Sequence, residues 1–116
     1  GVMSNNSKLA KRLVESGEVS GEKAWELPLC EDYKVALHSK LADLKNSTLQ
    51  AGYPSAVIAG LFLQEFVQST PWAHLDIAGT AYLREPRHYH PTKATGVGVR
   101  MILAFLEDLI DSQEEF

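Results

Sequence analysis

The stretch that most constrains this fold is residues 72–81, which read Trp-Ala-His-Leu-Asp-Ile-Ala-Gly-Thr-Ala. Alternate side chains of an extended strand point to opposite faces. One face then carries Ala73, Leu75 and Ile77, and the other carries Trp72, His74, Asp76 and Ala78. Because both faces are bulky, the pattern predicts an interior strand that is covered on both sides. Gly79 ends the strand, and the turn at 79–81 lies where α/β sheets place their ligands.

An amphipathic helix is predicted upstream of this strand. Residues 5–7, Asn-Asn-Ser, favour a helix N-terminus, and apolar residues recur at four-residue spacing past Gly17 until Pro28 stops the pattern. Gly17 and Gly21 each weaken a helix by about 1 kcal/mol relative to alanine. We therefore expect another backbone segment to approach this face of the helix closely.

Three further helices are predicted from composition and spacing. Residues 54–67 begin with proline and are almost entirely apolar, which predicts a helix buried on all sides and lying close to a sheet. Residues 31–37 carry acids in their first turn and predict a short helix. An apolar stripe over residues 97–109 predicts the last helix. The remaining segments are a strand candidate at 40–46, a loop at 46–54 and a polar loop at 82–94.

Together these elements predict a single α/β domain over residues 1–116, a partial layered sheet of about three strands with flanking helices. A helix joined to a strand by a short connection fits a parallel arrangement. The net charge is −4 and no basic stripe stands out, which argues against nucleic-acid binding. No apolar run approaches the ~18 residues of a membrane span.

The single cysteine, Cys30, excludes an internal disulfide and favours a reducing compartment. Acidic residues follow it and oppose a thiolate, so we interpret it as a buried or half-buried thiol and not as a nucleophile. The sequence opens without a signal peptide, and a cytoplasmic location is the expectation.

Two pairs of residues, each containing histidine, are candidate metal ligands. His74 and Asp76 lie two apart on one strand face, with Cβ atoms roughly 7 Å apart, and such a pair can supply two ligands to a metal ion. His88 and His90 form a His-x-His pair, which is a plausible zinc half-site. No third ligand follows at a set spacing, and prolines bracket the second pair. The structural interpretation is therefore favoured for both pairs.

Residues 95–98, Thr-Gly-Val-Gly, precede the last predicted helix. Helix N-termini attract anions, so this segment is a candidate anion site. The full dinucleotide fingerprint is absent, because the run does not directly follow a strand. An ordinary loop-to-helix connection is the favoured interpretation.

Several blocks of the sequence together resemble one enzyme family. Residues 72–79 resemble the signature near the C-terminus of leucyl aminopeptidases, the dimetal cytosol aminopeptidase family. Further similar blocks follow in family order at 4–6, 18–29, 42–46, 61–67 and 94–100. The resemblance covers nearly the whole chain and implies the C-terminal part of the family's catalytic domain.

This resemblance implies an α/β domain with a mixed central sheet, in an enzyme that assembles as a homohexamer and removes N-terminal residues, leucine among them, from peptides. Two divalent metal ions, zinc or manganese, hold the attacking water in such enzymes. The family's ligands lie on a lysine and aspartates and on an Asn-Thr-Asp-Ala-Glu-Gly-Arg motif, which this sequence lacks. We therefore expect this chain alone to bind no metal and to be inactive.

Four residues carry over as substrate contacts through the resemblance. Ala78, Gly79 and Ala81 match positions that line the pocket for the N-terminal side chain of the substrate. Alanine at position 81 leaves that pocket roomier than methionine would. Ser47 falls near the position that contacts the next substrate residue, although this chain reads Asn-Ser-Thr-Leu-Gln where the family reads Asn-Ile-Gly-Gly.

Two other functions remain open from the sequence. The first is a non-catalytic module that self-associates or binds peptide, because loss of neighbouring strands would expose a sheet edge. The second, weaker hypothesis is an independent metal hydrolase that uses His74, Asp76, His88 and His90.

Overall fold

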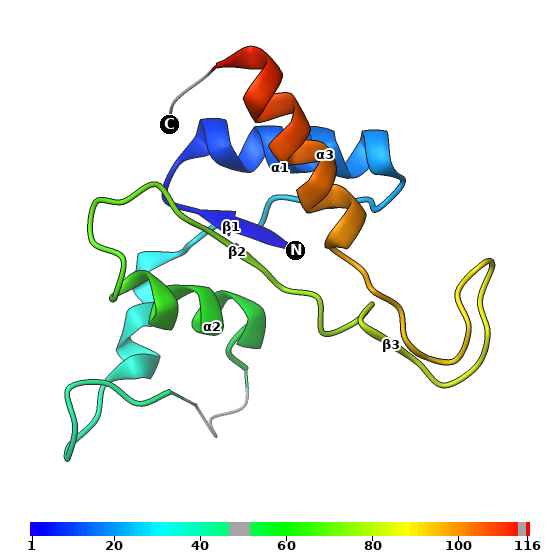
Figure 1. The fold of residues 1–116 in the computed structure, drawn as a ribbon. Coiled ribbons are helices and arrows are strands. Elements are labelled where there is room, and N and C mark those ends of the chain that lie inside the picture. The colour runs from blue at the N-terminus through cyan, green and yellow to red at the C-terminus, as the bar shows by residue number, and fades with distance from the viewer. Residues whose placement is uncertain (47–51, 114–115) are drawn as a thin grey trace.

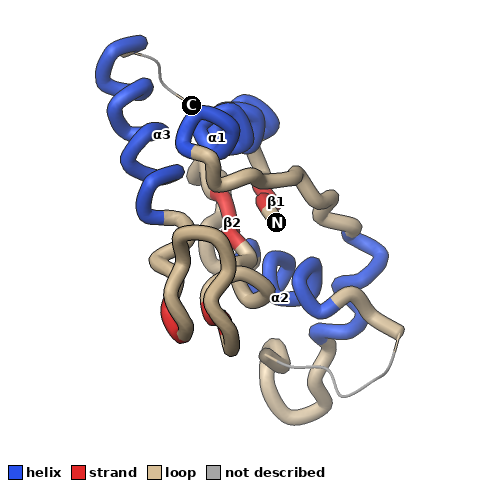
Figure 2. Tube along the Cα trace, turned by 90° about the vertical axis from the view of Figure 1, so that its right-hand side faces the viewer, coloured by secondary structure: helices blue, strands red, loops and turns tan. Residues whose placement is uncertain are grey.

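The computed structural model describes residues 1–46, 52–113 and 116. The elements in chain order are β1 (Val2–Ser4), α1 (Ser7–Ser20), the 3-10 helix η1 (Glu31–Leu37), α2 (Ser55–Gln64), β2 (Ala73–Leu75), β3 (Tyr82–Leu83), β4 (Lys93–Ala94) and α3 (Val99–Ser112). Figures 1 and 2 show β1 and β2 between two layers, with α1 and α3 on one side and α2 on the other. The mixture of helices with short strands confirms the α/β class.

β1 is the centre of the sheet. It pairs antiparallel with β2, so that Val2 lies opposite Leu75. On its other edge the N–H of Val2 donates to the carbonyl of Trp25, and the N–H of Leu27 donates to the carbonyl of Val2, both at 2.7 Å. This second contact is a parallel bridge. Three extended segments therefore lie side by side with mixed directions, although only two of them are strands of the sheet.

β2 is shorter and more exposed than its sequence predicts. The strand covers only Ala73–Leu75, and it runs antiparallel to its neighbour instead of parallel. Within the described ranges β1 is its only partner strand. Ile77 is 40% exposed. The prediction of an interior strand was wrong, because bulky side chains on both faces lead to burial only where neighbouring elements cover both faces and both edges.

The two faces of β1 enter different hydrophobic cores, because successive strand residues point in opposite directions. Val2, on one face, packs with residues of α1, namely Leu9, Ala10 and Leu13. Met3, on the other face, packs with residues of η1 and α2, namely Ala36, Leu37, Val57, Ile58 and Leu61. β1 thus joins the two helical layers.

α1 begins where the sequence predicts and ends earlier. The Asn6 side chain accepts a hydrogen bond from the N–H of Leu9 at 3.0 Å and caps the N-terminus. Gly21 ends the helix with φ 74°, well before Pro28, because a left-handed residue breaks the helical ladder. A Cβ at Gly17 would lie 2.7 Å from the carbonyl oxygen of Glu22. The predicted close approach of another backbone segment is therefore confirmed at Gly17.

α2 is buried on one face only. Val57, Ile58 and Leu61 are buried, whereas Leu63 is 40% exposed and Phe66, just beyond the helix, is 65% exposed. The prediction of burial on all sides was wrong, because the elements that pack against this helix in the described residues, among them β1, η1 and the segment with Leu29, leave Leu63 uncovered. The predicted proximity to a sheet is confirmed by Gly60, where a Cβ would lie 3.1 Å from the sulfur of Met3.

The remaining segments give mixed outcomes. The short helix is confirmed at Glu31–Leu37, and Cys30 before it is half-buried. Residues 40–46 form bends and irregular structure instead of the predicted strand. Leu41 is fully exposed, whereas Leu44 packs against the core without pairing with a strand. The polar segment 82–94 contains the β3–β4 hairpin. No helix in the described ranges is long and apolar enough to cross a membrane.

Candidate functional site

The turn that follows β2 is fixed by its own backbone. The N–H groups of Thr80 and Ala81 donate to the carbonyl of Ile77 at 3.0 and 2.9 Å. The carboxylate of Asp76 accepts a hydrogen bond from the N–H of Ala78 at 2.9 Å. The turn expected after the strand is therefore present, and Asp76 holds its first residue in place.

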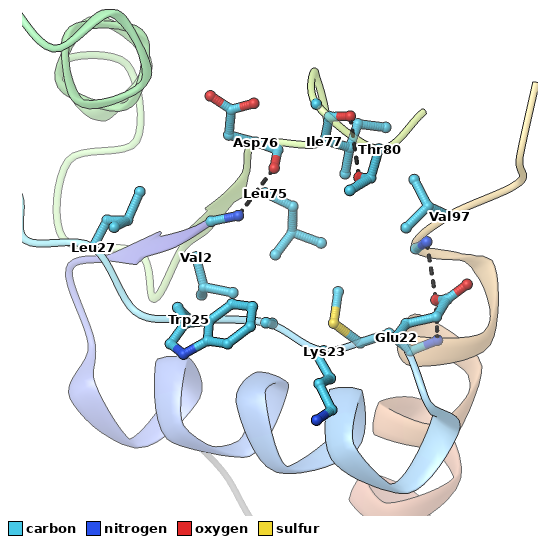
Figure 3. Close-up of a pocket in the computed structure, with 15 residues that line it drawn as sticks. Val2, Glu22, Lys23, Trp25, Leu27, Leu75, Asp76, Ile77, Thr80 and Val97 are labelled. Carbon is cyan, nitrogen blue, oxygen red and sulfur yellow. Dashed lines mark hydrogen bonds between the residues drawn. The ribbon is translucent and has the colours of Figure 1, made fainter. Parts of the chain in front are cut away.

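A cavity of about 340 Å³ lies beside this turn. Its walls come from the start of β1, the segment 22–27, the end of β2, the turn and the start of α3. Figure 3 shows Trp25, Leu75 and Val97 around the space. Gly79 lines the cavity, and a Cβ placed on Gly79 would meet no atom within 4 Å. The space above this glycine is thus open.

A second cavity, of about 360 Å³, adjoins the first at the same turn. Five residues line both cavities: Glu22, Lys23, Gly79, Thr80 and Val97. The tip of the β3–β4 hairpin supplies the outer wall of the second cavity with Arg87, His88, Tyr89 and His90. The sequence pattern predicts a surface loop for these residues and gives no sign that they lie next to the turn.

The four predicted substrate contacts have different positions in the structure. Gly79 lines both cavities. Ala78 and Ala81 belong to the same turn, at its exposed and half-buried positions respectively, and are not part of either cavity wall. Ser47 lies outside the described residues.

Glu22 is the residue that the sequence analysis missed. It is buried, with 8% of its surface exposed, and its carboxylate accepts hydrogen bonds from the N–H groups of Gly98 at 3.0 Å and Met101 at 2.9 Å. The Arg100 guanidinium donates to the same carboxylate at 3.3 Å. Free N–H groups and the helix dipole favour a negative charge at this position. No local pattern signals this contact, because 76 residues separate Glu22 from Gly98.

The candidate anion site at residues 95–98 is therefore filled by the chain's own carboxylate. An anion does bind the N-terminus of α3, as helix electrostatics predicts, but it is Glu22. This internal contact fixes the start of α3 against the turn that follows α1. The favoured interpretation of an ordinary loop-to-helix connection describes this segment better than a ligand site does.

Arg100 connects this carboxylate to the hairpin. Its guanidinium donates to the Tyr89 hydroxyl and lies 5.0 Å from the centre of the Tyr89 ring. The hydrogen bond to Tyr89, assisted by the one to Glu22, raises the pKa of Arg100 above its ordinary value. Arg87 and His90 exchange two backbone hydrogen bonds of 3.1 and 3.0 Å, which close the hairpin tip.

The described residues do not offer a donor set that fits a metal ion. His74 stacks on Trp72 with ring centres 6.3 Å apart, and His90 packs on Tyr89 at 4.3 Å. Within the described ranges no group of three or more histidines, cysteines or acids is placed to hold a metal. The structure therefore does not bring the four side chains of the metal-hydrolase hypothesis into one site.

The sequence of this chain is similar to part of a known family of enzymes. Residues 1–103 match the sequence profile of the cytosol aminopeptidase family, catalytic domain. The chain is 48% identical over 110 residues to a probable cytosol aminopeptidase of Protochlamydia amoebophila, and 50% identical over 110 residues to one of Roseiflexus castenholzii. These alignments cover 94% and 93% of this chain and 22% of each relative.

Two solved structures have the same fold over this chain. Both are the bottromycin maturation enzyme BotP, one of them in complex with Mn, and both are 35% identical in sequence. The TM-scores are 0.83 and 0.86, over 93% and 95% of this chain and 24% of the BotP chain in each case. The chain thus spans about a fifth of the curated relatives it matches. It belongs to the cytosol aminopeptidase family, within the catalytic domain.

Proposed function

We propose that this chain forms one wall of the substrate site, and the scaffold behind it, in a metal-dependent aminopeptidase that removes N-terminal residues from peptides. The observation that carries the proposal is the turn after β2. Backbone hydrogen bonds close this turn, it lines two adjoining cavities, and the space above Gly79 is open. Membership of the cytosol aminopeptidase family supplies the reaction class.

The small side chains of the turn suit an apolar substrate residue. Gly79 leaves room that a larger side chain would fill, and the neighbouring wall is formed by Leu75 and Val97. The contributions of Ala78 and Ala81 rest on the family resemblance, since neither residue lines a cavity. Apolar walls favour burial of a leucine-like side chain by about 25 cal/mol per Å². The contribution of Ser47 to the next subsite rests on the family resemblance alone.

Two divalent metal ions, zinc or manganese, belong to the proposal for a whole enzyme. The Mn complex of BotP supports metal dependence in a structural relative. The described residues of this chain do not fit such ions, so we place the ligands in other parts of the catalytic domain. In this proposal the present residues bind the peptide and exclude water from it.

Assembly and location extend the proposal. Relatives carry the name cytosol aminopeptidase, which supports a cytoplasmic enzyme with peptide substrates. Apolar side chains on α3 remain exposed, including Leu103 at 55% and Ile110 at 75%. Such a surface favours contact with the rest of a catalytic domain or with other copies, as in a homohexamer.

The same exposed surface favours a second candidate, a self-associating module without catalysis. Light scattering of the purified chain separates it from the first candidate. A monomer at millimolar concentration would contradict self-association. The self-associating module would be favoured if the purified chain forms oligomers and the chimera described in the next paragraph has no peptidase activity.

A segment exchange tests the enzymatic proposal. This chain replaces the matching segment of the Protochlamydia amoebophila relative, and hydrolysis of a leucine chromogenic amide is measured with manganese. We expect the chain alone to be inactive and the chimera to be active. Gly79→Trp in the chimera should lower kcat/KM at least about tenfold, because the indole fills the open space and costs about 1.4 kcal/mol or more in the transition state.

Leu41→Trp is the matched control, since Leu41 is fully exposed and lies in neither cavity wall. It should leave kcat/KM unchanged. Turnover by the chain alone, or equal kcat/KM for the folded Gly79→Trp and Leu41→Trp chimeras, would contradict the proposal.

A further inference from the structure

The second cavity is basic, although the chain as a whole carries a net charge of −4. Lys23, Arg87 and Arg100 line it, against a single carboxylate, that of Glu22. Glu22 is already bonded to the N-terminus of α3 and to Arg100. Lys23 and Arg87 form no ion pair in the part of the chain that the structure describes. Two cationic residues therefore line this space without an acidic partner.

The hairpin tip beside this cavity is held by its backbone and by Arg100. Reciprocal backbone hydrogen bonds between Arg87 and His90 close the tip, and Arg100 holds Tyr89 through its hydroxyl and its ring. Between Arg87 and His90, His88 adopts φ 54°, a conformation that non-glycine residues adopt rarely. A backbone that is already ordered loses less entropy when the site binds a ligand.

The size and the charge of the cavity restrict the ligand. A volume of about 360 Å³ is near the lower end for small-molecule sites. Arginine binds carboxylates through two parallel hydrogen bonds, which lysine can supplement as a point charge. The Glu22 carboxylate in the same wall repels a dianion more strongly than a monoanion. These features favour a carboxylate over a phosphate.

We propose that the cavity between the turn 79–80 and the hairpin tip binds the carboxylate of a small organic acid or of a short peptide, with Arg87 and Lys23 as its cationic partners. The site adjoins the first cavity and shares Glu22, Lys23, Gly79, Thr80 and Val97 with it, whereas Arg87 and the rest of the hairpin tip line only the second cavity. The proposal concerns binding by this chain and does not depend on the proposed peptidase activity.

Titration of the ¹⁵N-labelled chain tests the site directly. N-acetylglycine should shift the backbone amide signals of Gly79 and Thr80 saturably, and N-acetylglycinamide, which lacks the charge, should not. Acetate distinguishes the two sources of the carboxylate. Equal affinity for acetate indicates a free organic acid, and tighter binding of N-acetylglycine indicates a peptide end. Saturable shifts with inorganic phosphate but not with N-acetylglycine would overturn the proposal.

Substitutions assign the partners. Arg87→Gln and Lys23→Gln should each weaken binding of N-acetylglycine about fivefold, which corresponds to the upper range for an exposed ion pair. Arg84→Gln is the matched control, because Arg84 is exposed on the same segment and lines neither cavity. An equal loss from Arg84→Gln, or no loss from the other two, would overturn the assignment.

Thermal melting gives a second measurement that does not rely on resolved spectra. N-acetylglycine should raise the Tm of the chain, or of the chimera described above, as any ligand that binds the folded state does. The shift should be smaller in Arg87→Gln and unchanged in Arg84→Gln. Unchanged melting of all variants at saturating N-acetylglycine would contradict the site even where the peptidase activity is intact.

Discussion

The N-termini of α1 and α3 meet the same chemical need in opposite ways. The first N–H groups of any helix lack partners within the helix. In α1 the side chain of Asn6 accepts from Leu9, three residues ahead. In α3 the carboxylate of Glu22 accepts from Gly98 and Met101, which are 76 and 79 residues away. One helix start is therefore specified locally, and the other depends on the assembled fold.

This difference matters for the site. α1 buries an apolar face in the core and serves as scaffold, whereas Met101 is the only buried residue described in α3. Glu22 and Gly98 also line the cavity beside the turn. The helix start that depends on a distant residue is thus the one that shapes the candidate site. Substitutions at the N-termini of α1 and α3 should therefore show whether each helix start depends on local or on distant residues.

Glu22→Ala should give the largest loss of stability. It leaves the buried N–H groups of Gly98 and Met101 without an acceptor, and each such group costs about 1–3 kcal/mol. We expect the free energy of unfolding to fall by about 3 kcal/mol, measured by urea denaturation. Glu18→Ala removes an exposed acid from α1 and should change it by less than about 0.5 kcal/mol. Equal losses would show that α3 does not depend on Glu22.

Gly17→Ala should give the next largest loss. Alanine favours a helix by about 1 kcal/mol over glycine, but its Cβ would lie 2.7 Å from the Glu22 carbonyl, so the backbone that carries Glu22 must move. Overpacking costs about 1–3 kcal/mol, and we expect a net loss of about 1–2 kcal/mol in unfolding experiments. Glu15→Ala, on the exposed side of α1, is the control. If Gly17→Ala stabilises the protein, the backbone at Glu22 can move away from residue 17 at little cost.

Asn6→Ala should cost about 1 kcal/mol, the usual value for loss of an N-cap. The effect should be confined to the first turn of α1, because the acceptor and donor are local. Hydrogen exchange of the Leu9 amide should accelerate, while that of Met101 should not. Asn6→Asp retains an acceptor oxygen and should restore stability to within a few tenths of a kcal/mol.

Lys34 gives the smallest effect and contrasts a local partner with a distant one. Its ammonium lies 2.9 Å from Glu31 and 2.8 Å from Glu65. Hydrogen bonds to Glu31 and then Glu65 raise the pKa of Lys34 above 10.5. A raised folded-state pKa means that the pairs stabilise the protein at neutral pH and that this contribution is lost as pH rises through the folded pKa, above 10.5.

Because these side chains are a third or more exposed, Lys34→Met should lower the free energy of unfolding by only about 0.5 kcal/mol. The difference between Lys34→Met and the unchanged protein should vanish at a pH well above 10.5. Glu31→Gln and Glu65→Gln measure the local and the distant pair separately. A Lys34→Met loss that persists at high pH would indicate packing of the alkyl chain instead of charge.

Local features were predicted well. The bounds of η1, the N-cap of α1, the turn after β2 and the close approach at Gly17 agree with the structure. Each of these features depends on residues that are close together in the sequence, and the last one depends on glycine having no side chain. The substrate roles of Ala78, Gly79, Ala81 and Ser47 stay predictions, because no bound substrate tests them.

Predictions that depended on neighbours were less successful. The 72–81 strand and the 54–67 helix are apolar enough to be buried, yet both keep exposed side chains. The apolar spacing beyond Ser20 belongs to an extended segment beside β1 and not to a longer helix. Hydrophobic periodicity shows which residues favour burial, but it does not show which surfaces are available to cover them.

The fold class, the positions of most elements and, through several ordered blocks, the family follow from the sequence alone. The antiparallel pairing of β1 with β2, the contact of Glu22 with α3 and the basic cavity against the hairpin were decided by tertiary structure. The physical reason is distance along the chain. Caps, turns and amphipathic faces arise from neighbouring residues, whereas a buried charge and a cavity exist only after distant segments have packed together.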